Sequence, residues 1–236
     1  MTGTGSGGST GSGGRPEPGT VESLYPFLYS GASDLEAVLA DVRRSTVAKT
    51  AEITELRRAI AAQDGARLVQ CAADAADRFA RGGRLLAFGN GGSATDAGQV
   101  ASLFLYPGPD RRALPAYGLA SDTAIISALA NDVGPEVIFS RQIAAFGGPE
   151  DIAIGLSTSG NSENLVRAFE TASQRGLLTI GLAGYSGGKM AEIDSIDYLF
   201  VAPSTSVHRI QEAQTTVYNL LWELTLAALG GLAVTR

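Results

Sequence analysis

Short apolar segments that end in a glycine- and serine-rich turn, each followed by a helical pattern, constrain this fold more than any other feature. Segment 84–88 leads into turn 89–93, and segment 151–156 leads into turn 157–162. Three more strands are expected near 115–119, 177–182 and 198–201, with helices near 123–131, 162–175 and 207–229. Strands that alternate with helices form a parallel sheet covered on both faces. The sequence therefore predicts an α/β fold in three layers.

An apolar stripe over residues 33–63 predicts a long N-terminal helix. Its members recur every three or four positions: Leu35, Val38, Leu39, Val42, Val47, Ile53, Leu56 and Ile60. Ser33 and Glu36 have the spacing of a capping box at its start. A second helix is expected over 66–80, before Gly82 and Gly83. The stripe is too long for one domain to cover, so we expect it to pack against other copies of the chain.

Composition excludes several classes of protein. Residues 1–19 contain eight glycines and only Met1 is apolar, so we expect a disordered tail before a domain that covers 20–236. The net charge is -6 without a cluster of Lys or Arg, which argues against nucleic-acid binding. Cys71 is the single cysteine, so no disulfide framework is expected. No signal peptide or membrane span is predicted, which favours a cytoplasmic location.

The turn at 157–162 has the composition of an anion site. Its four hydroxyls belong to Ser157, Thr158, Ser159 and Ser162, and Gly160 permits a close approach of the backbone. The helix that follows presents unpaired N–H groups at its start. Each charge-assisted hydrogen bond contributes about 1.5–3 kcal/mol, so this turn is expected to hold a phosphate monoester without a cation. A helix cap at Ser162 within an ordinary turn is the alternative.

The turn at 89–93 lacks the GxGxxG spacing of a dinucleotide site, and a tight strand-to-helix turn explains it equally well in isolation. Both turns, however, follow buried strands. Ligands of parallel sheets bind beyond the carboxyl ends of the strands. One ligand that contacts both turns is therefore the preferred interpretation.

Six segments occur in the order found in a known family: GNGGSATDA at 89–97, ALANDVG at 128–134, FSRQI at 139–143, STSGNSENL at 157–165, GGKMAE at 187–192 and RIQE at 209–212. They resemble the sedoheptulose 7-phosphate isomerases, or phosphoheptose isomerases, which are sugar isomerase (SIS) domain proteins. The resemblance implies a five-stranded parallel sheet, a homotetramer and a pocket shared between subunits. It also implies sugar-phosphate contacts from Asn90, Gly91, Ser93, Asp132, Ser157, Thr158, Ser159, Ser162 and Gln211.

The resemblance also identifies four positions of the family's metal and acid–base site. In the family these are His, Glu, Gln and His; here they are Gln99, Leu103, Gln211 and Asn219. Leucine binds neither metal nor proton, and carboxamides are poor zinc ligands. Loss of a general base costs about 10²–10⁴-fold in rate. We therefore expect no zinc or other cofactor, and no metal-dependent isomerase activity.

Three functions are compatible with these residues. The preferred one is a phosphosugar-binding oligomer that senses a ligand or acts as a scaffold without catalysis. The second is an active isomerase with a rebuilt acid–base site, for which His208, Asp132 and Glu212 are candidates. The third is a regulator that binds a protein partner, like the DnaA initiator-associating protein. Asp96, in the first turn of its helix, is assigned to the helix dipole.

Overall fold

The computed structural model describes residues 35–109 and 111–232. The chain divides into two compact units, 1–49 and 50–236. The predicted tail at 1–19, the domain boundary at residue 20 and the cap residue Ser33 lie outside the described residues.

The N-terminal helix is longer than the sequence predicts. Helix α2 runs without interruption from Leu35 to Ala80, so the two helices expected at 33–63 and 66–80 are one. Gly65 costs a helix about 1 kcal/mol relative to alanine. The side chain of Asp64 is nevertheless buried and accepts a hydrogen bond of 2.9 Å from Arg67, one turn ahead. This pairing and the burial of Leu68 and Cys71 keep the helix continuous.

Five parallel strands form the sheet, in the order β2-β1-β3-β4-β5. The strands are β1 (Leu85–Gly89), β2 (Ala116–Gly118), β3 (Ile152–Leu156), β4 (Leu178–Gly184) and β5 (Tyr198–Ala202). Every residue of β1, β3 and β4 is buried, as expected for strands with a helical layer on each face. The fold class and the five-stranded parallel sheet are confirmed.

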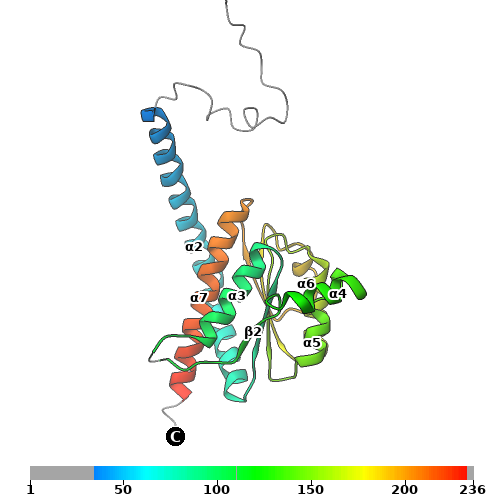
Figure 1. The fold of residues 1–236 in the computed structure, drawn as a ribbon. Helices are drawn as coiled ribbons and strands as arrows, with labels where there is room; N and C mark the ends of the chain where they lie inside the picture. Colours follow the sequence, from blue (N-terminus) through cyan, green and yellow to red (C-terminus); the bar gives the residue numbers. More distant parts are fainter. Residues whose placement is uncertain (1–34, 110, 233–236) are drawn as a thin grey trace, which may run out of the picture. The chain divides into compact units, whose positions relative to one another are not determined.

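Helices cover both faces of the sheet (Figure 1). One face packs against the buried part of α2, α3 (Gly92–Leu105) and α7 (Val207–Leu232). The other packs against α4 (Thr123–Asp132), α5 (Ser140–Phe146) and α6 (Glu163–Gln174). Helix α5 and the short 3-10 segments η2 (Pro135–Val137) and η3 (Gly188–Ala191) were not predicted. None of the described helices is long and apolar enough to cross a membrane.

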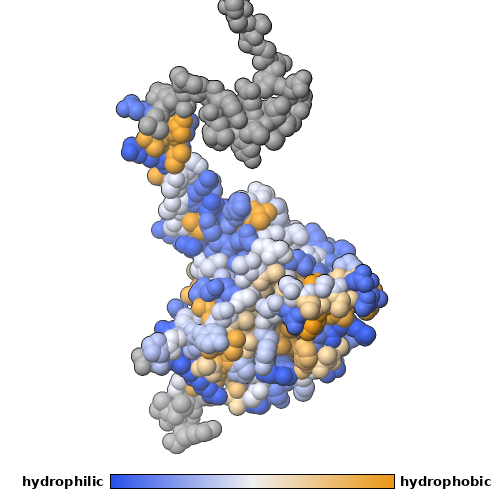
Figure 2. Space-filling view, viewed as in Figure 1, coloured by the Kyte–Doolittle hydropathy of each residue, from blue (hydrophilic) through white to orange (hydrophobic). Residues whose placement is uncertain are grey.

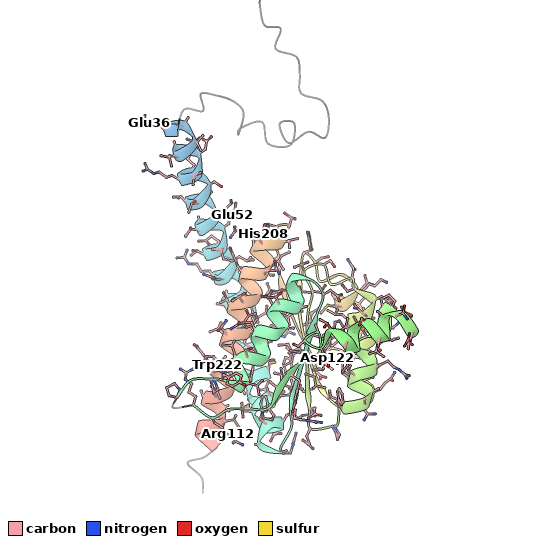
Figure 3. The ribbon with its side chains drawn as sticks, in the orientation of Figure 1. Glu36, Glu52, Arg112, Asp122, His208 and Trp222 are labelled. Atoms are coloured by element: carbon pink, nitrogen blue, oxygen red, sulfur yellow. The ribbon has the colours of Figure 1, made fainter. Side chains whose placement is uncertain are left out.

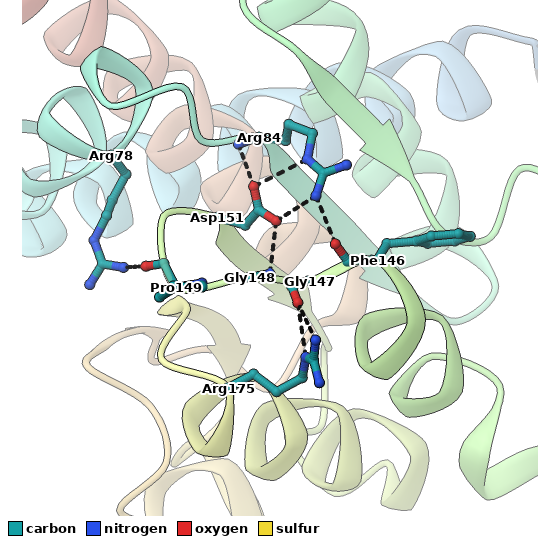
Figure 4. Close-up of polar contacts among 8 residues, drawn as sticks. All are labelled: Arg78, Arg84, Phe146, Gly147, Gly148, Pro149, Asp151 and Arg175. Atoms are coloured by element: carbon teal, nitrogen blue, oxygen red, sulfur yellow. Dashed lines mark hydrogen bonds and ion pairs between the residues drawn. The ribbon is translucent and has the colours of Figure 1, made fainter.

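A saturated polar network closes the amino edge of the sheet (Figure 4). The carboxylate of Asp151 accepts hydrogen bonds from the backbone N–H and the guanidinium of Arg84 at 2.8–3.2 Å, and from Gly148 N at 3.0 Å. Arg84 also donates to Phe146 O, and Arg175 donates to Gly147 O. These bonds hold the loop before β3 in place.

The carboxyl edge is organised by the strand order. The chain passes from β1 through α3 to β2 on one side, and from β3 through α6 to β4 on the other. Helices α3 and α6 therefore lie on opposite faces, and the loops that lead into them diverge between β1 and β3. Such a switch point is where open α/β sheets form a ligand crevice.

Candidate functional site

The turn at 157–162 is held in shape by its own side chains. Gly160 N donates to Ser157 Oγ at 3.0 Å, and Asn161 N donates to Ser159 Oγ at 3.2 Å. Gly160 has a φ of 68°, in the region that favours glycine. The hydroxyls of Ser157 and Ser159 accept these bonds and keep their own protons for a ligand.

Ser162 differs from the other hydroxyl residues of this turn. It is the N-cap of α6, but its side chain makes no cap hydrogen bond. The expected capping role is therefore filled by the backbone alone, since Ser162 O accepts from Leu165 and Val166. A hydroxyl without a hydrogen bond to any other described residue thus lies at the N-terminus of a helix, where an anion is stabilised.

Hydrogen bonds join the turn at 89–93 to α6, the helix that follows the turn at 157–162. Asn90 and Asn164 exchange two side-chain hydrogen bonds of 2.9 Å each. Gly91 is the N-cap of α3 with a φ of 56°, and Ser93 is buried in the first turn of that helix. The two turns therefore lie side by side, at the edge where a sheet of this topology is expected to form its ligand crevice. A contact of either turn with a sugar phosphate stays a prediction.

A third loop contacts the turn at 157–162, and the residue types of the sequence did not indicate it. The 3-10 segment η3 follows β4, and Met190 N donates to Gly160 O at 3.0 Å. Lys189 N donates to Asn161 Oδ1, also at 3.0 Å. A side chain at Gly160 would collide with Gly187 O, so the two loops touch at their backbones. In the sequence, this contact was signalled only by the segment GGKMAE at 187–192, to which no role was assigned.

Helices α3 and α7 form a polar wall of the crevice. Gln211 on α7 lies against the first turn of α3, because a Cβ at Gly92 would be 2.5 Å from Gln211 Nε2. Gln211 Nε2 also donates to Asp96 Oδ2 at 3.4 Å. Burial raises the pKa of Asp96, against the opposing effect of the bond from Gln211. Asp96 is therefore a half-buried carboxylate that faces α7, whereas the sequence suggested only a helix-dipole role.

Gln214 links the same helix to the phosphate turn. Its side chain is buried, and Nε2 donates to Ser157 O at 3.1 Å. Its Oε1 has no hydrogen-bond partner in the part of the chain that the structure describes. Helix α7, which carries Gln211, is thereby tied to the turn at 157–162.

The residues at the four family metal positions do not fit a zinc ion. Leu103 packs against the hydrophobic core, and Asn219 Nδ2 donates to Thr215 O at 2.8 Å within its own helix. Gln99 is exposed. Residues 35–109 and 111–232 contain no group of three or more His, Cys, Asp or Glu side chains placed to hold a metal ion. The absence of zinc from the protein itself stays a prediction.

The three catalytic candidates from the sequence lie on two helices: His208 and Glu212 are four residues apart on α7, and Asp132 is on α4. His208 is exposed on the first turn of α7 (Figure 3) and has no ion pair among the described residues. Glu212 pairs with Arg209, which also lies 3.9 Å from Glu52. Asp132 ends α4 and accepts a bond from its neighbour Asn131. None of them is hydrogen-bonded to either turn within the described chain.

Comparison with known proteins identifies the family. The SIS domain model matches residues 50–184. The chain is 42% identical over 174 residues to a phosphoheptose isomerase of Aquifex aeolicus, covering 73% of this chain and 90% of that one. It is 45% identical over 150 residues to a phosphoheptose isomerase of Geotalea daltonii, covering 63% and 77%. The solved phosphoheptose isomerase of Neisseria gonorrhoeae superimposes with a TM-score of 0.71 at 31% identity, covering 78% and 98%.

These relatives correct the preferred functional prediction. A phosphosugar-binding protein without isomerase activity was inferred from four side-chain positions, but relatives at 42–45% identity are phosphoheptose isomerases. The inference failed because it weighed only the inherited metal positions. It assigned Asp96 to the helix dipole, whereas the tertiary structure places this carboxylate beside Gln211. The chain belongs to the SIS-domain family of phosphoheptose isomerases.

Proposed function

We propose that this protein is a ketose–aldose isomerase that acts on sedoheptulose 7-phosphate or a closely related sugar phosphate. The observation that carries the proposal is a sequence identity of 42% to a phosphoheptose isomerase. The chain covers 90% of the length of that isomerase. The site supports it, because hydroxyls at the start of α6 and a half-buried carboxylate in the first turn of α3 lie at the same edge of the sheet. Such a site suits a ligand with an anionic end and a reactive end.

The phosphate is assigned to the turn at 157–162. Its donors are the hydroxyls of Ser157, Thr158, Ser159 and Ser162 with the first N–H groups of α6. Asn90, Gly91 and Ser93, from the other turn, would then contact the sugar. This placement directs the carbonyl end of the sugar toward α3 and α7.

The acid–base group is assigned to Asp96. Its carboxylate takes a proton from C1 of the ketose, the C–H electron pair forms the C1–C2 double bond, and the C2–O2 π pair moves to O2 to give an enediolate. A proton then moves from O1 to O2, a lone pair of O1 forms the C1–O1 double bond, and the C1–C2 π pair takes the proton of Asp96 at C2 to give the aldose. Gln211, whose Nε2 donates to Asp96, would donate an amide N–H to the charged oxygen of the sugar. Burial raises the pKa of Asp96, which makes its carboxylate a stronger base than an exposed one.

Proton NMR with sedoheptulose 7-phosphate tests the proposal, because line broadening reports binding and new aldose signals report turnover. We expect both from the native protein. Asp96→Asn should lower the rate by about 10²–10⁴-fold while broadening persists. Binding without any aldose signal from the native protein would contradict the isomerase proposal.

Three further variants compare Asp96 with the candidates from the sequence. His208→Gln, Asp132→Asn and Glu212→Gln each remove a titratable group that lacks a hydrogen bond to the turns in the described structure. Each should keep turnover within about threefold of native, a loss well below that expected for a general base. A larger loss in one of them, with Asp96→Asn fully active, would transfer the acid–base role to that residue.

A homotetramer is proposed for the assembly, as the family resemblance implies. The first unit supports self-association, because Val38, Leu39, Val42 and Val47 are 46–70% exposed along α2. Figure 2 shows apolar side chains at the surface of these first turns. Light scattering at micromolar concentration should give the mass of four chains, and Leu39→Asp with Val42→Asp should lower it. A native monomer would contradict this proposal.

Metal content provides an independent measurement. We expect no stoichiometric zinc after dialysis, because Leu103 and Asn219 offer no suitable ligand. Metal analysis showing one zinc per chain would contradict this prediction and reopen the assignment of Asp96.

A further inference from the structure

Lys189 is a cationic residue whose backbone is anchored on the proposed phosphate turn. Its backbone N–H bonds to Asn161 Oδ1, and the next residue bonds to Gly160 O, each at 3.0 Å. Two consecutive residues of η3 are therefore fixed to the middle of the turn. The close backbone contact between Gly160 and Gly187 leaves little room for this loop to shift.

The side chain of Lys189 is held weakly. It is 54% exposed, and its ammonium lies 3.4 Å from Glu163 Oε2. Glu163 is the first residue of α6 and also pairs with Arg167 at 3.2 Å. Exposed ion pairs of this kind contribute little to stability. The backbone of Lys189 is therefore fixed on the turn, whereas its side chain is free to move. The ammonium lies at the start of the helix that would receive the phosphate.

We propose that Lys189 is a phosphate-binding residue of this site, whose ammonium transfers from Glu163 to a phosphate oxygen when ligand is bound. A phosphate dianion carries more charge than the carboxylate and accepts strong charge-assisted bonds. The ion pair with Glu163 holds the ammonium near the turn until ligand arrives. This proposal deepens the proposed function, since it rests on the turn at 157–162 being the phosphate site.

Arg167 provides a matched control. It pairs with the same carboxylate and is 45% exposed, but it lies one turn farther along α6 and makes no hydrogen bond to residues 157–162 in the described structure. Lys189→Met and Arg167→Met therefore remove one cation each from Glu163. Only the first removes a cation that is anchored on the turn.

Calorimetry with inorganic phosphate as the probe separates the two roles, and it does not depend on turnover. Loss of one charge-assisted bond corresponds to about 10–100-fold weaker binding, which is expected for Lys189→Met. Arg167→Met should stay within about twofold, and Lys189→Arg should recover most of the affinity. With sedoheptulose 7-phosphate, Lys189→Met should raise KM and leave kcat nearly unchanged.

Each contrary outcome has a distinct meaning. Equal effects of Lys189→Met and Arg167→Met, or no effect of Lys189→Met, would overturn the role of Lys189 while leaving the phosphate turn intact. Failure of the native protein to bind inorganic phosphate at all would overturn the phosphate assignment of 157–162, and the role of Lys189 with it. Circular dichroism of each variant verifies that the fold is retained.

Discussion

The two edges of the sheet use similar polar residues in opposite ways. At the amino edge, the carboxylate of Asp151 is 6% exposed and accepts four hydrogen bonds of 2.8–3.2 Å (Figure 4). At the carboxyl edge, the carboxylate of Asp96 is half-buried and, among the described residues, accepts one long side-chain bond, of 3.4 Å from Gln211. Both carboxylates lie beside a buried strand or helix, but only the first is saturated.

This difference separates stability from function. A saturated buried carboxylate has no acceptor capacity left for a ligand. Removing it leaves its hydrogen-bond donors without an acceptor. A carboxylate with fewer hydrogen bonds keeps acceptor capacity for a substrate, but it makes the ligand-free protein less stable. The hydroxyl of Ser162 and the Oε1 of Gln214, both at the carboxyl edge, likewise have no partner within the described residues. These two groups therefore keep polar capacity at the carboxyl edge, unlike the saturated carboxylate of Asp151.

The largest expected effect is at the amino edge. Asp151→Ala should lower the free energy of unfolding by about 3–5 kcal/mol, because it leaves the Arg84 guanidinium and two backbone N–H groups without their acceptor. Urea unfolding measures this, and turnover per folded molecule should be unchanged. The neighbouring Glu150→Ala is the control, since its pair with Arg81 is exposed and should cost under about 1 kcal/mol. Equal losses for the two variants would refute the contrast between a buried and an exposed carboxylate.

The second effect is at the carboxyl edge and concerns binding. Ser162→Ala should weaken the binding of inorganic phosphate by about 1.5–3 kcal/mol, as measured by calorimetry, through loss of one bond to a charged group. Its stability should change by less than about 0.5 kcal/mol, because the side chain makes no cap bond. Ser173→Ala, on the exposed side of α6, controls for a general effect on the helix. A stability loss without a binding loss would make Ser162 a structural residue.

The smallest effect concerns the pH dependence of stability. Because the pKa of Asp96 is raised in the folded protein, its protonated form is favoured by folding. That stabilisation is complete at low pH and is lost as pH rises through the folded-state pKa. Asp96→Asn should therefore be more stable than the native protein at neutral pH by a few tenths of a kcal/mol after solvent screening. The gain should vanish near about pH 4 in urea unfolding. A loss of stability at neutral pH would show that Asp96 is held as firmly as Asp151.

The strands and the two glycine-rich turns were predictable because their signals are local. A run of buried residues followed by a turn and a helical pattern has few alternatives, and β1, β3 and β4 lie within one or two residues of their expected bounds. Helix α5 was missed because Ser140–Phe146 is short. The break expected near Gly65 does not exist, because tertiary packing outweighs the propensity of one glycine.

The sequence by itself determined the parallel sheet, its two polar turns and the family to which the chain belongs. Only the tertiary structure decided which side chains share the crevice. Gln211 and Asp96 are separated by more than a hundred residues, and Lys189 lies beyond a further strand, so no spacing rule relates them. They lie at the same edge of the sheet because the strand order brings the starts of α3, α6 and η3 there. Local patterns encode elements, whereas a site made of distant elements depends on how those elements pack.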